Sequence, residues 1–291
     1  MGLANWFQTF CDDLQVDTAT SISTRYAALT TRLNTDFWGT TSATAHSLYV
    51  GSYGRNTAIR GISDVDMIFE LPWALYTQYN AYLLNGQSAL LQAVKSSIQK
   101  TYPNTSIRGD GQVIQVAFWD MTFEVVPAFP HSDGLYTYPD ANAGGSWRTT
   151  NPRAEIAAIR TRNIACNYNL VPLCRMMRQW KSEWSVPMGG LLIDTLAYQF
   201  IENWENKKKS YLYYDFMCRD FFKFMADQSA DQTFWRVPGS SSYVYGGGFQ
   251  YKAKRCYNLS LEAIQHEMAD PKREWSSKQK WREIFGTRFP S

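Results

Sequence analysis

Strand-like segments in this sequence are confined to residues 47–127, and helical periodicity dominates on both sides of them. Apolar residues recur at helical spacing over 3–15 and 18–37, before this region. Short runs rich in β-branched and aromatic residues predict the strands, at 47–50, 64–71, 112–119 and 121–127. The last two runs meet at Asp120 and predict a hairpin. Residues 73–101 predict two helices with a break near Asn85-Gly86.

The second half of the chain is predicted to be helical. Residues 131–150 are rich in Gly, Pro, Ser and Tyr and are expected to form a long loop. Asn151 is a suitable N-cap and Pro152 a suitable first helical residue. The helices expected after them cover 152–163, 168–184, 189–206, 211–227, 250–269 and 272–285. The sequence therefore predicts an α+β protein in which a mixed sheet over 1–150 precedes a helical lobe over 151–291, with a cleft between them.

Composition excludes several classes of protein. The formal net charge is only +3, which argues against a strongly basic nucleic-acid coat. The five cysteines are scattered without a Cys-x-x-Cys pair, and there are three histidines, so a disulfide framework and a zinc site have no support. No basic residues precede the first apolar positions, and no apolar run reaches the ~18 residues of a spanning helix. We expect a soluble cytoplasmic protein without a membrane partner.

The segment 51–66, GSYGRNTAIRGISDVD, carries the chemistry. Asp64 and Asp66 point to the same face of a strand, because side chains alternate along it. Two neighbouring carboxylates repel one another unless a cation lies between them, and Mg²⁺ prefers oxygen ligands. Gly51-Ser52 precedes them at a spacing suited to a phosphate-binding turn. The alternatives are a solvated Asp-x-Asp at a strand end and an ordinary Gly-Ser turn.

The string GSYGRNTAIRGISDVDM, over residues 51–67, resembles the signature of the DNA polymerase β-like nucleotidyltransferases. It is most similar to the bacterial CD-NTases, relatives of cyclic GMP-AMP synthase and the oligoadenylate synthetases. Three more segments resemble this family, WRTTNPRAE (147–155), RMMRQWK (175–181) and MGGLLIDTLAYQF (188–200). The resemblance covers most of residues 20–270. It implies a catalytic lobe with a mainly antiparallel mixed sheet over 1–150 and a helical nucleotide-binding lobe over 151–291.

The resemblance also implies a third metal-binding carboxylate. The segment MTFEVVPAF (121–129) lies where the family has this residue, and it holds Glu124 where many members have Asp. Glutamate keeps the charge but reaches one methylene farther. Asp120, at the hairpin turn, is the alternative, although Asp is favoured in turns for local reasons. Asp64, Asp66 and Glu124 are thus the expected catalytic residues and the ligands of two Mg²⁺ ions, for which Mn²⁺ is a substitute.

Gly51, Ser52 and Arg55 are expected to bind the triphosphate of the nucleotide. A second set comes from the stripe Arg175, Arg178 and Lys181 on the helix expected at 168–184. In related enzymes a basic residue two positions before the helix Trp contacts phosphates, and Arg178 occupies this position. Lys181 is the second choice and Arg175 the third. The alternative is an amphipathic helix with a solvated basic edge.

The implied activity joins and cyclises NTPs into a cyclic di- or trinucleotide second messenger, with release of pyrophosphate, in bacterial antiphage (CBASS) signalling. ATP and GTP are the expected substrates, with pyrimidine NTPs as further candidates, and a messenger-activated effector protein is the expected downstream partner. We expect a monomer that binds no nucleic acid. Trp147, Tyr211 and Tyr213 are candidates for stacking on bases.

Three alternatives remain open from the sequence. One is an enzyme that adds nucleotides to RNA ends, proteins or small molecules. Another is a sensor that binds nucleotides without turnover. The last is a nucleic-acid-binding module in the basic segment 251–291, whose Trp275, Trp281 and Phe285 equally suit an amphipathic helix packed on the body.

Overall fold

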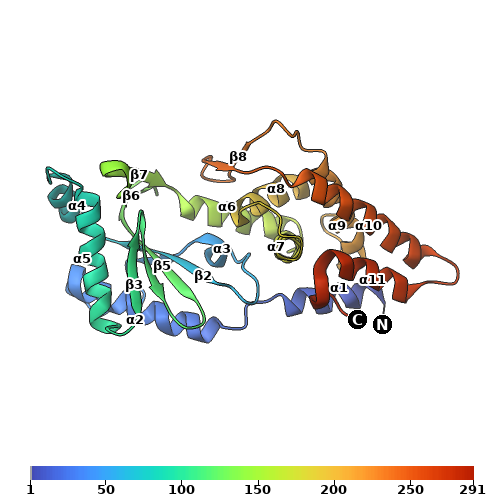
Figure 1. The fold of residues 1–291 in the computed structure, drawn as a ribbon, viewed down its shortest axis with the longest axis horizontal. Coiled ribbons are helices and arrows are strands. Elements are labelled where there is room, and N and C mark those ends of the chain that lie inside the picture. The colour runs from blue at the N-terminus through green and yellow to red at the C-terminus, as the bar shows by residue number, and fades with distance from the viewer. Residues whose placement is uncertain (1) are drawn as a thin grey trace. The chain divides into compact units, whose positions relative to one another are not determined.

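The computed structural model describes residues 2–291, which divide into two compact units (Figure 1). The sheet unit comprises Asp17–Arg55 and Gly61–Ile156. The helical unit comprises residues 2–16, Asn56–Arg60 and Ala157–Ser291. The division differs from a single boundary at residue 150, because the first helix and the short segment after Arg55 group with the later helices.

A seven-stranded mixed sheet organises the sheet unit. Its main path follows the order β1 (Ser47–Tyr49), β2 (Asp64–Glu70), β5 (Thr122–Pro130), β4 (Val113–Ala117) and β3 (Ser106–Asp110). Strands β2 and β5 are parallel, and the other pairs are antiparallel. The predicted hairpin around Asp120 is confirmed as β4–β5. The central place of β2 and β5 brings two chain segments nearly 60 residues apart into direct register.

Two long helices cover the apolar side of this sheet. Helix α2 (Ala19–Trp38) contacts β2 and α5, while α5 (Gly86–Thr101) contacts β3 and β4. Asn85 caps α5, because its side-chain oxygen accepts a hydrogen bond from Ser88 N at 2.9 Å. The predicted break before α5 is thereby confirmed, and α4 (Trp73–Asn80) precedes it. The other helical segments here are α3 (Gly51–Gly54), η1 (Asn142–Gly144) and the start of α6 (Pro152–Ala165).

The expectation of a long loop over 131–150 is wrong. Strands β6 (Tyr136–Asp140) and β7 (Ser146–Thr150) form a hairpin there, and β6 pairs with the end of β5. Gly144 and Gly145 have positive φ angles and make the turn. The Tyr and Thr residues that flank them favour strands, and the Gly and Pro content hid this signal. Strand β3 and a hairpin of β8 (Phe234–Arg236) and β9 (Tyr243–Tyr245) also lie outside the predicted strands.

The helical unit is built on an aromatic core. Phe7 of α1 (Leu3–Asp13) packs edge-on against Trp281, with ring centroids 5.2 Å apart, and Phe10 lies 4.8 Å from Phe285. Helix α10 contacts α9 and α11, and α11 contacts α7. The bounds are α7 (Leu170–Glu183), α8 (Gly190–Asn203), η2 (Tyr211–Tyr213), α9 (Tyr214–Ala226), α10 (Gln250–Met268), α11 (Glu274–Phe285) and η3 (Gly286–Arg288).

The basic segment at the end of the chain is part of this core. Trp281 and Phe285 are fully buried, whereas Trp275 is exposed. The interpretation of this segment as an amphipathic helix packed on the body is therefore confirmed for its apolar face. Among residues 2–291, no helix combines the length and the apolar character needed to cross a membrane.

Candidate active site

The turn after β1 brings the backbone against the carboxylate of Asp66. Gly51 opens the short helix α3 with φ of 59°, in the left-handed region that glycine tolerates. A Cβ atom at this residue would lie 1.7 Å from Asp66 Oδ2. Val50 N donates to Asp66 O at 2.9 Å and fixes the position of this turn on β2. Position 51 therefore requires glycine for both its φ angle and its lack of a side chain.

Strand β2 presents the two predicted aspartates on one face. Val65 and Met67 are fully buried on the opposite face, as the alternation predicts. Asp64, at the beginning of the strand, is exposed and accepts a hydrogen bond from Ser63 Oγ at 2.8 Å. Asp66 is partly buried beside Gly51. The shared face of Asp64 and Asp66 is confirmed.

Glu124 lies on β5 directly beside Asp66. The parallel register pairs Asp66 with Glu124, and the antiparallel register of the next strand pairs Glu124 with Gln115. Gln115 Nε2 donates to Glu124 Oε1 at 2.9 Å, and Arg108 Nε donates to Gln115 Oε1 at 2.8 Å. Two neighbouring strands thus orient the Glu124 carboxylate.

Asp120 has a different environment. It lies in the turn between β4 and β5, where its Oδ1 is 2.6 Å from Arg25 Nη1 in an ion pair. Its charge is compensated by this arginine. Between the two candidates for the third carboxylate, Glu124 is the one that the strand register places next to Asp66.

The carboxylates of this face repel one another. Burial raises the pKa of Asp66 to about 6, and the charges of Glu124 and Asp64 add to this effect, while Arg55 opposes it. Arg55 is itself buried, and its Nη1 lies 3.5 Å from Glu155 Oε2. A hard divalent cation would relieve this repulsion, because all the donors here are carboxylate oxygens.

The three carboxylates do not converge on one point in the structure. Within residues 2–291, no group of three or more His, Cys, Asp or Glu side chains has an arrangement that holds a metal ion. Asp66 and Glu124 lie side by side, and Asp64 is hydrogen-bonded to Ser63 instead. The donor chemistry fits Mg²⁺, and closing the set requires a change in the side chain of Asp64.

The basic residues of the predicted phosphate clamp lie on α7 in the helical unit. Arg178 is buried, and its guanidinium grips Asp194 of α8 with two contacts, Nη1–Oδ1 at 2.5 Å and Nη2–Oδ2 at 2.9 Å. Arg178 Nη2 also donates to Gly190 O at 3.0 Å. Lys181 is half-buried at the end of the helix. The role of Arg178 and Lys181 toward phosphates stays a prediction.

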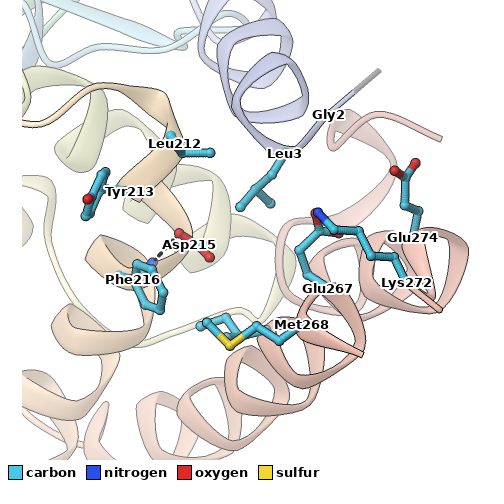
Figure 2. A pocket seen from close by; sticks show the side chains of 11 residues that line it. Gly2, Leu3, Leu212, Tyr213, Asp215, Phe216, Glu267, Met268, Lys272 and Glu274 are labelled. Carbon is cyan, nitrogen blue, oxygen red and sulfur yellow. Dashed lines mark hydrogen bonds and ion pairs between the residues drawn. The ribbon is translucent and has the colours of Figure 1, made fainter. Parts of the chain in front are cut away.

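A hollow of about 540 Å³ in the helical unit is separate from these residues (Figure 2). It lies among the starts of α1, α9 and α11 and the end of α10, and Tyr213 lines it. Asp215 faces it with only 3% of its surface exposed, and burial raises its pKa to about 6. Lys272 Nζ forms an ion pair with Glu267 Oε1 at 3.0 Å. None of the predicted catalytic or phosphate-binding residues lines this hollow.

Comparison with known proteins decides the family. Residues 1–163 match the model of the Second Messenger Oligonucleotide or Dinucleotide Synthetase (SMODS) domain, over more than half of the chain. The chain belongs to this family. A probable cyclic nucleotide synthase of Bacillus cereus is 23% identical over 278 residues, covering 83% of this chain and 81% of the relative.

Two further similarities extend beyond the family model. A cyclic AMP-AMP-AMP synthase of Acinetobacter is 23% identical over 265 residues, covering 84% of this chain and 73% of the relative. The CdnC structure in the CdnC:HORMA-deltaN complex of E. coli MS115-1 superposes with a TM-score of 0.69 at 14% identity. It covers 99% of this chain and 98% of that one, which shows the shared fold along the whole length.

These findings confirm that the protein is a bacterial CD-NTase with the polymerase β-like α+β fold. It is a nucleotidyltransferase of the kind that makes cyclic nucleotide second messengers. The role of Gln115, which orients Glu124, cannot be predicted from the sequence, because nothing marks a strand glutamine before the pairing of strands is known. Asp194 is a second site-related residue that was not predicted, and its signal in the sequence is a lone charge within the apolar run LLIDTLA.

Proposed function

We propose that this CD-NTase joins and cyclises NTPs, ATP and GTP foremost, on the face formed by Asp64, Asp66 and Glu124. The observation that carries the proposal is the register of β2 and β5, which sets Asp66 beside Glu124 while Gly51 closes on Asp66. Burial and the charges of Glu124 and Asp64 raise the pKa of Asp66, so a cation bound at this face would be favourable. A face of this kind is built to receive a triphosphate together with its metal.

Asp64, Asp66 and Glu124 would hold two Mg²⁺ ions. Bound there, Mg²⁺ would offset the charge of the triphosphate and of the leaving pyrophosphate and would lower the pKa of the attacking hydroxyl. Gln115 keeps Glu124 in place through its hydrogen bond at 2.9 Å. The 2′- or 3′-oxygen of one nucleotide forms a bond to the α-phosphorus of the next, the bond to pyrophosphate breaks, and the hydroxyl proton passes to water. A second transfer of the same kind, between the two ends of the linear product, closes the ring.

Residues beside the carboxylates would bind the phosphates. Gly51 allows close approach of the backbone, and the Ser52 hydroxyl and the Arg55 guanidinium lie on the same turn. From α7, Lys181 and Arg178 would add positive charge toward the triphosphate. Arg178 is oriented by its two contacts with Asp194, so a direct contact with phosphate requires that part of its guanidinium remains available.

The product would act as a messenger in CBASS antiphage signalling and activate a separate effector protein. Support comes from the family, whose members synthesise oligonucleotide or dinucleotide second messengers. One relative is a cyclic AMP-AMP-AMP synthase, so a cyclic trinucleotide is a candidate product beside a cyclic dinucleotide.

The test is incubation of the protein with mixed NTPs and Mg²⁺, followed by phosphatase treatment, chromatography and mass spectrometry. We expect a small phosphatase-resistant product that is lost with EDTA, restored by Mn²⁺, and absent from Asp66→Asn and Glu124→Gln. Asp120→Asn is the matched control, because it removes a carboxylate that is paired with Arg25. Turnover by Asp66→Asn would overturn the proposal, and extension of added RNA or labelling of protein would show the alternative acceptors instead.

A further inference from the structure

The five residues that follow the phosphate-binding turn are anchored in the helical unit. Residues 51–55 belong to the sheet unit, and Asn56–Arg60 belong to the helical unit. At the start of this segment, Arg175 Nη2 donates to Asn56 Oδ1 at 2.9 Å. At its end, Arg60 N donates to Leu14 O at 2.9 Å, and Arg60 Nη1 lies 2.7 Å from Asp13 Oδ1. The segment is thus held at both ends.

Its centre is held by a buried charged network. Thr57 is fully buried, and its Oγ1 donates to Asp194 Oδ2 at 2.9 Å. Asp194 is 1% exposed and also accepts two hydrogen bonds from Arg178, which donates in addition to Gly190 O. A carboxylate is rarely this buried unless it is paired, so the network is well satisfied and rigid. Gly190 leaves room for Arg178, because a Cβ there would lie 3.0 Å from Arg178 Nη2.

We propose that Asp194 is a positioning residue for the Gly51–Arg55 turn and acts through Thr57. Thr57 is two residues beyond Arg55, so their Cα atoms are at most about 7 Å apart along the chain. By fixing Thr57, Asp194 fixes the point at which the chain leaves the turn. Arg178 in this view orients Asp194. The inference deepens the proposed function, on which its kinetic part rests.

The turn itself is a very short helix. Its helix α3 spans four residues, and the backbone bonds that close it are Gly54 N to Val50 O at 2.8 Å and Arg55 N to Gly51 O at 3.1 Å. So short a helix is not stable by itself. Loss of the anchor at Thr57 would let these two bonds open more often. The amides of this turn would then be less preorganised for binding phosphates.

The test compares two buried threonines that differ in what they hold. Thr57→Val removes the hydroxyl that binds Asp194. Thr195→Val, on α8, removes an equally buried hydroxyl whose hydrogen bond runs within α8, to Leu191 O at 2.8 Å. Hydrogen–deuterium exchange of the amides of 51–56 is measured in the purified protein without NTP. We expect exchange about tenfold faster in Thr57→Val only, the factor that corresponds to one hydrogen bond to a charged group.

Kinetics supply the second measurement. Thr57→Val should raise the KM for NTP by up to about tenfold, with kcat changed less than twofold. Thr57→Ser keeps a hydroxyl and should restore the wild-type KM. Thr195→Val should behave as wild type. If Thr57→Val does not fold, Asp194→Asn serves instead, since it weakens the acceptor of the Thr57 hydroxyl and leaves the backbone of 51–57 unchanged.

The outcomes separate the two proposals. If the amides of 51–56 exchange at the same rate in Thr57→Val and Thr195→Val, the positioning role is overturned. An equal KM for NTP in these two variants would also overturn it. A wild-type protein that consumes no NTP overturns the proposed function, while the exchange comparison still decides whether Asp194 and Thr57 hold the turn.

Discussion

Replacement of Gly51 by alanine tests the central geometry of the site. A Cβ at this position would lie 1.7 Å from Asp66 Oδ2 and 2.5 Å from its Cγ. Real contacts of this kind stay above 3.0 Å, so the carboxylate must move by at least 1.3 Å, the difference between 3.0 and 1.7 Å. A misplacement of about 1 Å in a catalytic group can cost about 10²-fold in rate. We therefore expect Gly51→Ala to lower turnover of NTP by about 10²-fold or more.

Gly39→Ala is the matched control. Gly39, at the end of α2, has φ of 65°, close to the 59° of Gly51, and a Cβ there would meet no atom within 4 Å. Both variants carry the cost of a left-handed alanine, about 1–2 kcal/mol. Both should lose a few degrees of Tm in thermal unfolding, and only Gly51→Ala should lose activity. If Gly51→Ala kept the turnover of Gly39→Ala, the contact between the turn and Asp66 would not matter for catalysis.

Three further outcomes follow from other parts of the structure. Glu124→Asp, which withdraws the carboxylate by one methylene, should retain more product formation than Glu124→Gln in the NTP assay; equal activities would show that the charge at this position is not needed. Asp215→Asn should raise the free energy of unfolding in urea by up to about 3 kcal/mol at pH 8 and by almost nothing at pH 4. The native pKa of Asp215 is raised to about 6, so the stability that its protonated form contributes is present below about pH 4 and is lost as the pH rises through 6. An equal change in the free energy of unfolding at both pH values would contradict this explanation. Trp281→Ala should destabilise the protein by about 3–5 kcal/mol, because Trp281 is fully buried against Phe7 and Phe289; a loss under about 1 kcal/mol in the same titration would contradict the aromatic core.

The order of elements was largely predictable because it depends on local pattern. Helical spacing over 18–37 and alternation over 64–71 are set by neighbouring residues, and the structure has α2 and β2 there. The β6–β7 hairpin was missed because its strands are completed by pairing with β5, which no local pattern records. Glycine and proline in the same stretch indicate a turn and do not show what flanks it.

In the candidate site too, local features were predictable from the sequence and contacts between distant segments were not. The sequence by itself determined the residue types and spacing of Gly51, Asp64 and Asp66, because both aspartates belong to one strand and alternation fixes their common face. It also determined the family, because this string is distinctive. Only the tertiary structure decided that Glu124 rather than Asp120 stands beside Asp66, since the register of β2 and β5 is a contact between distant segments. It also decided that Arg178 grips Asp194, because a buried arginine takes the nearest carboxylate that the packing of α7 and α8 provides.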